Sequence, residues 1–316
     1  MKPVSRWLSL LCLAFATLSL TACDEIMLGG IEDNISKTFQ VQPGGKLTVD
    51  SSMGSLEVVT TADPMVKIDV RRIARAQDQK GATDILKDLQ MDFRQQGNEV
   101  TVEARYQGSR WHEWGNRLQL KYFIQVPQRF NLDLKTGGGS VQVSDLEGSI
   151  VARTSGGSLR FGQIQGTVNG RTSGGSINME GGTGAVDVHT SGGSIRLGKV
   201  SASVKANTSG GSITLEEVMG TIQATTSGGS VTASLTKQPQ DNCELSTSGG
   251  SIHIKLLPSL NLNLRANCSG GTVRTDFPVK VQGEIDKHRL EANINGGGPE
   301  LYLHSSGGGI SIEAIH

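Results

Sequence analysis

The feature that most constrains this chain is a pentapeptide, Thr-Ser-Gly-Gly-Ser, that recurs at a fixed spacing. The first copy is Thr154–Ser158, four more follow at 18-residue steps, and a sixth follows after a 21-residue step. A variant that begins at Cys268 comes after another 21-residue step. A fixed period of this kind indicates a repeat architecture, in which each unit packs against its neighbours. Low-complexity filler would show no such phase.

Each 18-residue period divides into two units of nine. Gly175–Met179 (Gly-Ser-Ile-Asn-Met) is followed nine positions later by Gly184–Val188 (Gly-Ala-Val-Asp-Val). Apolar, variable, apolar is the period of a β-strand, and the Gly-rich remainder indicates a turn. We therefore predict an all-β chain, a single β-solenoid (β-helix) with two strands in each 18-residue coil. A triangular coil needs an aliphatic residue every six positions, and Ser201, six after Ile195, excludes it.

The nine-residue unit also occurs early in the chain. Gly45–Val49 and Gly54–Val58 stand nine positions apart, and the ladder resumes after residue 121. We therefore expect the solenoid domain to cover residues 39–313, with residues 71–121 as an excursion that interrupts it.

The excursion has the sequence signals of a helix and a hairpin. Thr83 or Asp84 is expected to cap a short helix that carries Ile85. The segment Gln96–Asn98 is expected to be the turn of a β-hairpin, because short alternating apolar stretches lie on both sides of it.

Stacking of the coils predicts the core. Neighbouring coils lie about 4.8 Å apart, so Val186 should lie on Val204, and Ile195 on Ile213. Each buried aliphatic side chain stabilises the fold by about 1.5–3 kcal/mol. We expect the Gly pairs at corners that need positive φ, because Gly inside a strand costs about 0.5–1 kcal/mol relative to Ala. The Thr of each repeated pentapeptide should lie directly on the Thr of the next coil.

Residues 1–22 have the pattern of a bacterial lipoprotein signal peptide. A basic start leads into an apolar run, Trp7–Leu20, which is short for a membrane span and ends in Leu-Thr-Ala-Cys23. We expect cleavage before Cys23, a lipid on its thiol that holds the protein to a membrane, and an anchor and linker over residues 23–38. Asp24 favours the inner membrane, facing the periplasm, with the outer membrane as the alternative.

Charge argues against a nucleic-acid partner. Without Lys2 and Arg6 of the signal peptide, the 30 basic residues of the chain fall to 28, against 30 acidic ones. Nucleic-acid binding favours a strongly basic face instead.

Two cysteines fall within the repeats. Aligned on the repeat, Cys243 takes the position of Val204 and Cys268 that of Thr208, one coil apart and four positions apart along the strand. Four positions span about 13 Å, and a disulfide needs Cα atoms within about 7 Å. We predict two buried free thiols.

The outward positions show no repeated chemical group. Asn169, Asp187 and Lys205 follow one another in successive coils, so the Thr ladder of an ice-binding solenoid and the Asp ladder of calcium-binding repeats are both missing. Acids such as Glu180 and Glu216 are scattered, and no nucleophile or zinc motif occurs. We predict no enzyme, no catalytic residue, no cofactor and no metal. The Gly corners could alternatively form anion-binding nests.

One segment of the excursion is rich in contact-forming side chains. Trp111 and Trp114 lie close to Arg110 and Arg117. Trp and Arg are frequent at binding surfaces, so we predict that these four residues contact an envelope glycan or a protein partner. The alternative is that the two Trp pack on the flank or end of the solenoid.

The end of the chain predicts a second contact surface. The last strand, at Ile310–Ile312, has no later residues to cover its edge. Because an unpaired strand edge can pair with another chain, we predict a candidate self-association site at Ile310–Ile315.

The chain resembles a known bacterial family. Val126–Pro127, Leu132–Gly137, the Thr-Ser-Gly-Gly-Ser-Ile ladder, Asn295–Leu301 and Ser306–Ile310 are similar to the putative-adhesin family of β-strand repeats, a domain of unknown function. The resemblance covers about residues 39–313 and implies an envelope protein with no established catalytic residues.

These observations together favour a lipid-anchored, non-enzymatic binding or scaffold protein of the cell envelope. Two alternatives stay open: a polysaccharide-active β-helix enzyme, and an envelope-stress accessory protein that binds a membrane partner.

Overall fold

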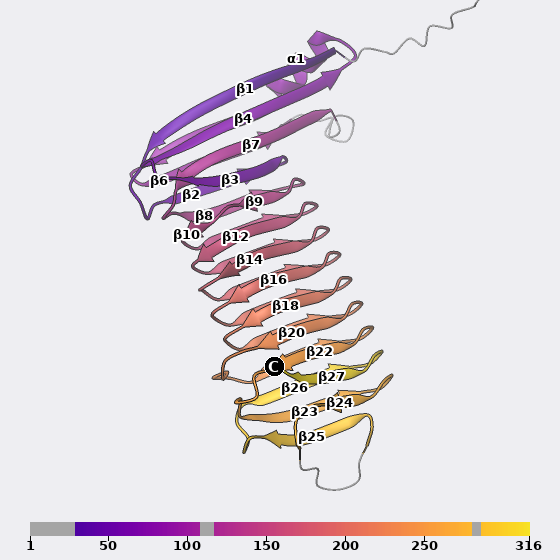
Figure 1. Ribbon diagram of the computed structural model, residues 1–316. Coiled ribbons are helices and arrows are strands. Elements are labelled where there is room, and N and C mark those ends of the chain that lie inside the picture. Colours follow the sequence, from indigo (N-terminus) through magenta and orange to yellow (C-terminus); the bar gives the residue numbers. More distant parts are fainter. Residues whose placement is uncertain (1–28, 108–116, 280–285) are drawn as a thin grey trace, which may run out of the picture.

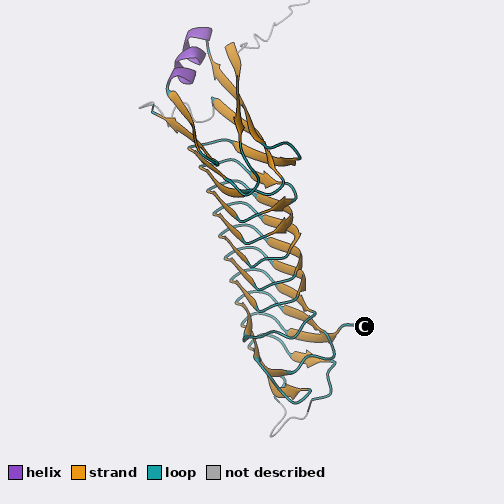
Figure 2. Cartoon of the chain, turned by 90° about the vertical axis from the view of Figure 1, so that its left-hand side faces the viewer, coloured by secondary structure: helices purple, strands orange, loops and turns teal. Residues whose placement is uncertain are grey.

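The computed structural model describes residues 29–107, 117–279 and 286–316 (Figure 1). The described chain is a stack of two-stranded coils, in which two long sheets face each other across one apolar core (Figure 2). The all-β solenoid prediction is therefore confirmed. In this part of the chain, no helix has the length and apolar character needed to cross a membrane.

Within the described residues, the first sheet has 14 strands and the second has 13. In spatial order the first contains β1 (Gly29–Gln40), β4 (Met65–Ala76), β7 (Leu118–Pro127), β3 (Ser55–Thr61), β9 (Val141–Val143), β12 (Leu159–Gln165), β14 (Ile177–Gly182), β16 (Ile195–Val200), β18 (Ile213–Val218), β20 (Val231–Leu235), β22 (Ile252–Leu256), β27 (Ile310–Ala314) and β24 (Val273–Thr275), with β10 (Leu146–Glu147) beside β12. The second contains β25 (Arg289–Ile294), β23 (Leu262–Cys268), β26 (Glu300–Ser305), β21 (Cys243–Thr247), β19 (Ile222–Thr226), β17 (Val204–Thr208), β15 (Val186–Thr190), β13 (Val168–Thr172), β11 (Ile150–Thr154), β8 (Asn131–Thr136), β2 (Lys46–Ser51), β6 (Glu99–Tyr106) and β5 (Leu89–Gln96).

The middle of the chain follows the predicted register. Strands alternate between the two sheets, and each pairs in parallel with the strand one 18-residue period away: Val186 lies beside Val204, and Ile195 beside Ile213. All four side chains are buried. Each coil therefore stacks its apolar side chains on those of the next, as the nine-residue period predicts.

The corner Thr residues form a buried polar column along the core. Thr172, Thr190 and Thr208 lie beside one another in register and are buried. The Oγ1 of Thr190 donates a hydrogen bond to the carbonyl oxygen of Gly175, at 2.7 Å, and accepts one from the N–H of Gly193, at 3.3 Å. The hydroxyl thus links its own corner to the preceding one by hydrogen bonds. These bonds satisfy a buried polar group, which without partners would lower the stability of the fold.

The reason for the corner glycines differs from the predicted one. None of the Gly residues of the Thr-Ser-Gly-Gly-Ser corners has positive φ. A Cβ on Gly175 would instead overlap the carbonyl oxygen of Gly157, and a Cβ on Gly193 would overlap that of Gly175. Glycine is needed because the backbones of successive corners approach too closely for a side chain.

The N-terminal end departs from the predicted boundaries. Residues 29–38 belong to β1, which pairs antiparallel with β4, so the predicted linker over 23–38 is wrong for its described part. The predicted excursion over residues 71–121 is also only in part an excursion from the solenoid, because β6 and β7 form a complete coil. That coil stacks on β2 and β3, which in turn stack on β8 and β9.

The helix and hairpin are present, with one corrected detail. The helix is α1 (Gln79–Lys87), and its N-cap is Asp78, not Thr83 or Asp84: the Asp78 carboxylate accepts a hydrogen bond from the N–H of Gly81 at 2.7 Å. Strands β5 and β6 form the predicted hairpin.

The C-terminal end corrects the predicted bare edge. The final strand β27 pairs with β22 on one side and with β24 on the other, so Ile310 lies between Ile252 and Val273. In the second sheet β26 is likewise inserted between β21 and β23. The last coil of the sequence is therefore an inner coil, and self-association through Ile310–Ile315 loses its structural basis (Figure 1).

The two cysteines are free and buried, as predicted. Cys268 lies beside Ser305 and Cys243 beside Leu301, so the strand β26 separates them and they are two coils apart instead of one. Burial raises the pKa of the Cys243 thiol, which makes its reactive thiolate form less accessible.

Candidate binding groove

Most of the residues singled out as contact sites lie outside the described chain. Cys23, Arg110, Trp111 and Trp114 all fall in undescribed segments. Arg117 is described and exposed, and its carbonyl oxygen accepts a hydrogen bond from the N–H of Arg75 at 2.8 Å. The lipid anchor and the Trp-rich contact surface therefore stay predictions.

The Gly corners do not form the anion-binding nests considered above. In one corner the N–H of Gly174 donates to the carbonyl oxygen of Ser155, that of Gly175 to Thr172 Oγ1, and that of Ser176 to Ser158 Oγ. The next corner repeats the same three bonds. These N–H groups bind the coils to one another and are not presented to a ligand.

Charged side chains on the outer faces mostly link neighbouring coils. Asp50 on β2 forms ion pairs with Arg105 on β6 and Lys135 on β8, and the hydrogen bond from Arg105 holds the pKa of Asp50 below its ordinary value. On the other sheet Lys199 pairs with Glu217 of the next coil. Within the described residues, no group of three His, Cys, Asp or Glu side chains could hold a metal ion.

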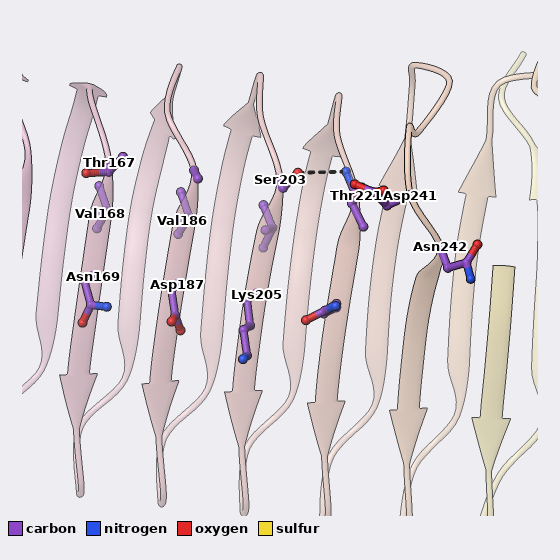
Figure 3. A pocket seen from close by; sticks show the side chains of 13 residues that line it. Thr167, Val168, Asn169, Val186, Asp187, Ser203, Lys205, Thr221, Asp241 and Asn242 are labelled. Atoms are coloured by element: carbon purple, nitrogen blue, oxygen red, sulfur yellow. Dashed lines mark hydrogen bonds between the residues drawn. The ribbon is translucent and has the colours of Figure 1, made fainter. Parts of the chain in front are cut away.

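A groove of about 580 Å³ crosses the outer face of the second sheet, near the start of four successive strands (Figure 3). Strands β13, β15, β17 and β19 and the corners before them form its length, and the loop between β20 and β21 adds Asp241 and Asn242 at one end. The lining residues are Thr167, Val168, Asn169, Ala185, Val186, Asp187, Ser203, Val204, Lys205, Thr221, Gln223, Asp241 and Asn242.

One row of polar side chains runs along this groove. The parallel register places Asn169 beside Asp187, Asp187 beside Lys205, and Lys205 beside Gln223. The row changes from amide to carboxylate to ammonium within three coils. It presents hydrogen-bond acceptors at one end and donors further along, over a distance set by the strand spacing of about 4.8 Å.

Two acceptors of this row are buried and lack a partner. Asn169 Oδ1 and Asp187 Oδ1 form no hydrogen bond within the described chain, although Asp187 Oδ2 accepts one from Arg171 at 3.2 Å. Buried polar atoms are nearly always paired, so each exception calls for an explanation. Because the chain covers both oxygens, a hydroxyl or amide donor of a ligand in the groove would reach them after the Asn169 and Asp187 side chains rotate toward it.

The residues of this row can be found in the sequence, but no sequence signal marks them as a binding site. Asn169, Asp187 and Lys205 are outward residues one 18-residue period apart, and no residue type persists among them. The loop that adds Asp241 and Asn242 lies in a 21-residue step, where the repeat does not predict positions. Only the folded chain shows that the loop and the row border one groove.

Comparison with known proteins gives a family and a set of distant structures. The profile of the Toastrack DUF4097 family matches residues 46–313. No curated protein matches the chain.

Among solved structures, a putative adhesin from Bacteroides fragilis shares 14% identity, with 90% of this chain and 97% of that one covered and a TM-score of 0.40. A putative adhesin from Parabacteroides distasonis shares 12% identity, with 90% and 97% covered and a TM-score of 0.35. A putative cell adhesion protein from Clostridium sporogenes shares 13%, with 90% and 100% covered and a TM-score of 0.23. At these sequence identities and TM-scores, the matches support no conclusion about function.

Proposed function

Because the chain belongs to the Toastrack DUF4097 family, we propose a function for the solenoid as a whole: a non-enzymatic, adhesin-type binding or scaffold protein of the bacterial cell envelope. The family match spans nearly the whole described chain, and the fold offers long outer faces that a ligand can contact across several coils. Attachment to a membrane through a lipid on Cys23 is part of the proposal, and its support is the Leu-Thr-Ala-Cys pattern after the apolar run.

The observation that carries the proposal is the polar row in the groove on the second sheet. Asn169 and Asp187 each have a buried oxygen without a donor in the described chain, and Lys205 lies one coil further along. An extended polar polymer with many hydroxyl groups fits this arrangement, because it can donate to the two oxygens and accept from the ammonium group. We therefore propose a glycan of the cell envelope as the ligand class.

Binding of isolated envelope polysaccharide tests the proposal directly. We expect the double substitution Asn169→Ala/Asp187→Ala to weaken binding about tenfold or more in calorimetry, because two acceptor sites are lost and each hydrogen bond contributes about 0.5–1.5 kcal/mol. The matched control is Asn178→Ala/Thr214→Ala, outward positions on the first sheet. Equal binding by both double variants would refute the groove as the site.

The Trp-rich segment is a second proposed contact surface. Substitution of Trp111 and Trp114 by Ala is expected to reduce binding to envelope material without changing the unfolding midpoint. A loss of stability with unchanged binding would show instead that the two side chains pack on the solenoid.

One observation is a reason to test the alternative that the protein is a polysaccharide-active enzyme. Two carboxylates, those of Asp187 and Asp241, line the same groove, and glycoside hydrolysis uses a pair of carboxylates. Release of reducing ends from the bound polysaccharide, abolished by Asp187→Asn or Asp241→Asn, would replace the binding proposal by the enzymatic one.

A further inference from the structure

The strand β1 forms one edge of the first sheet. It pairs with β4 along its whole length, from Gly29 to Gln40, and no other described strand pairs with β1. Figure 1 shows β1 at the outermost position of the stack, at the end opposite β24 and β25. A long unpaired edge is a template for another strand, and soluble proteins usually block such edges.

The core is incompletely covered at this edge. Ile31, Ile35 and Phe39 lie on the inward face, because their partners across β4 are the buried Ala74, Val70 and Val66. The three β1 side chains pack on the core and stay partly exposed.

The facing edge of the second sheet shows the same incomplete burial. Met91 and Phe93 on β5 pack against the core and are also partly exposed. Both sheets therefore end in apolar side chains that the described chain covers only in part. The helix α1 lies at this end of the stack (Figure 2).

The inward face of β1 has a pattern that is complementary to itself. It reads Ile31, Asp33, Ile35, Lys37, Phe39. If two copies pair antiparallel about a two-fold axis at Ile35, then Asp33 of each copy lies opposite Lys37 of the other, and Ile31 opposite Phe39. Directly opposite residues share a face of the sheet, so every such pair is apolar with apolar or acid with base.

The neighbouring registers lack this match. A two-fold axis at Asn34 sets Ile31 opposite Lys37 and Asp33 opposite Ile35, and an axis at Ser36 sets Asp33 opposite Phe39. Axes at Asp33 or Lys37 bring two like charges together, which is destabilising. The sequence therefore specifies one register, as burial of one sheet face requires.

The side chains are available for these contacts. The Lys37 side chain is exposed and forms no ion pair or hydrogen bond with the described chain. Asp33 pairs with Arg72 on β4, whose side chain is mostly buried and whose Nε lacks an acceptor there. Lys37 of a second copy would reach Asp33 from the open side, and Asp33 would then lie between two cations.

We propose that the protein forms a two-fold dimer through β1, with Ile35 on the axis, so that the first sheets of two copies join into one continuous sheet. The contact is isologous, since the same strand serves both copies. It covers Ile31, Ile35 and Phe39 and removes the open edge. The dimer does not involve the groove on the second sheet and is independent of the function proposed above.

The oligomeric state of the charge variants tests the proposal. We expect light scattering of the wild type to give twice the mass of one chain, and Lys37→Glu to weaken the dimer about tenfold or more, because two attractive pairs become repulsive. Lys37→Arg is the matched control and should stay dimeric. Because the Lys37 side chain forms no ion pair or hydrogen bond within the described chain, circular dichroism should show both variants folded.

Cross-linking tests the register. In a background with Cys12 and Cys23 replaced by Ser, Ile35→Cys should give a disulfide-linked dimer on oxidation, because the two Cβ atoms meet at the axis. Thr38→Cys should not, because its two copies would lie about 20 Å apart along the strands. A wild type that is monomeric at all concentrations, or a dimer that Lys37→Glu leaves intact and Ile35→Cys fails to cross-link, would overturn the proposal.

Discussion

At the scale of single residues, close approach between coils decides which side chains fit. The Gly pairs of the corners need no unusual φ, and the strand spacing of about 4.8 Å is the reason for them. Thr190 shows the complementary requirement, because it is fully buried and its hydroxyl bonds to two corner backbones. Ser305, which lies beside Thr247 in this column, keeps both bonds with a smaller side chain.

Gly193→Ala tests the close approach. A Cβ at Gly193 would overlap the carbonyl group of Gly175, so we expect a loss of about 1–3 kcal/mol in the free energy of unfolding, as for other overpacked sites. Gly138→Ala is the control, since a Cβ there meets no atom within 4 Å, and it should change stability by less than about 0.5 kcal/mol. Urea denaturation measures both, and equal midpoints for the two variants would contradict the close-approach account.

At the scale of elements, both terminal coils are placed one position inside the stack. Near the N-terminus, β2 and β3 lie between β6–β7 and β8–β9. Near the C-terminus, β26 and β27 lie between β21–β22 and β23–β24. Chain ends usually fray unless they are tied down, and here the first and last coils gain a neighbour on each side. Strands that pair antiparallel, β5 and β25, lie at the outer ends.

Hydrogen exchange tests this arrangement. We expect the amides of β27, although it is the last strand of the sequence, to exchange as slowly as those of β20 in the middle of the stack. The short outer strand β24 serves as the comparison and should exchange faster, because it pairs on one side only. Mass spectrometry of peptides that cover the three strands would measure this, and exchange of β27 at the rate of β24 would show that the inserted coil opens independently.

At the scale of the whole molecule, the solenoid is a sum of similar coils with two different ends. The central coils share their register and differ mainly in the outward residues, so stability should depend on the number of coils and on contacts between neighbours. This regularity stops at the two ends: one carries the strand β1 with its unpaired edge, and the other carries the short β24 in the first sheet and β25 in the second.

Deleting whole or half periods separates these contributions. Removal of residues 191–208 joins Thr190 to Ser209 and restores an intact corner, so we expect a folded protein that is less stable and shorter by about 4.8 Å in small-angle scattering. Removal of residues 191–199 alone would delete most of β16 and leave β15 and β17, two strands of the same sheet, connected only by residues 200–203, so this variant should fail to fold. A well-folded nine-residue deletion would show that the coil does not require two strands in fixed alternation.

Much of this fold follows from the order of residues. The 18-residue step predicts parallel strands in register, and the pairs Val186–Val204 and Ile195–Ile213 confirm it. The contacts of a repeat protein can be predicted from its sequence because each coil is stabilised by its immediate neighbours. The period of the sequence therefore also gives the residues that touch in the fold. The burial of Cys243 and Cys268 as free thiols follows from the same alignment.

The tertiary structure alone decided the order of the terminal coils and the position of the candidate groove. The sequence places Ile310 last, and the fold places it between Ile252 and Val273. Insertion of a strand leaves no periodic trace, because a parallel neighbour can come from any distance along the chain. For the same reason, nothing in the repeat relates Asp241 to Asp187, whereas the folded loop brings both to one groove. The sequence determined how a coil is built, and the fold determined which coils are neighbours, since that choice depends on long-range pairing.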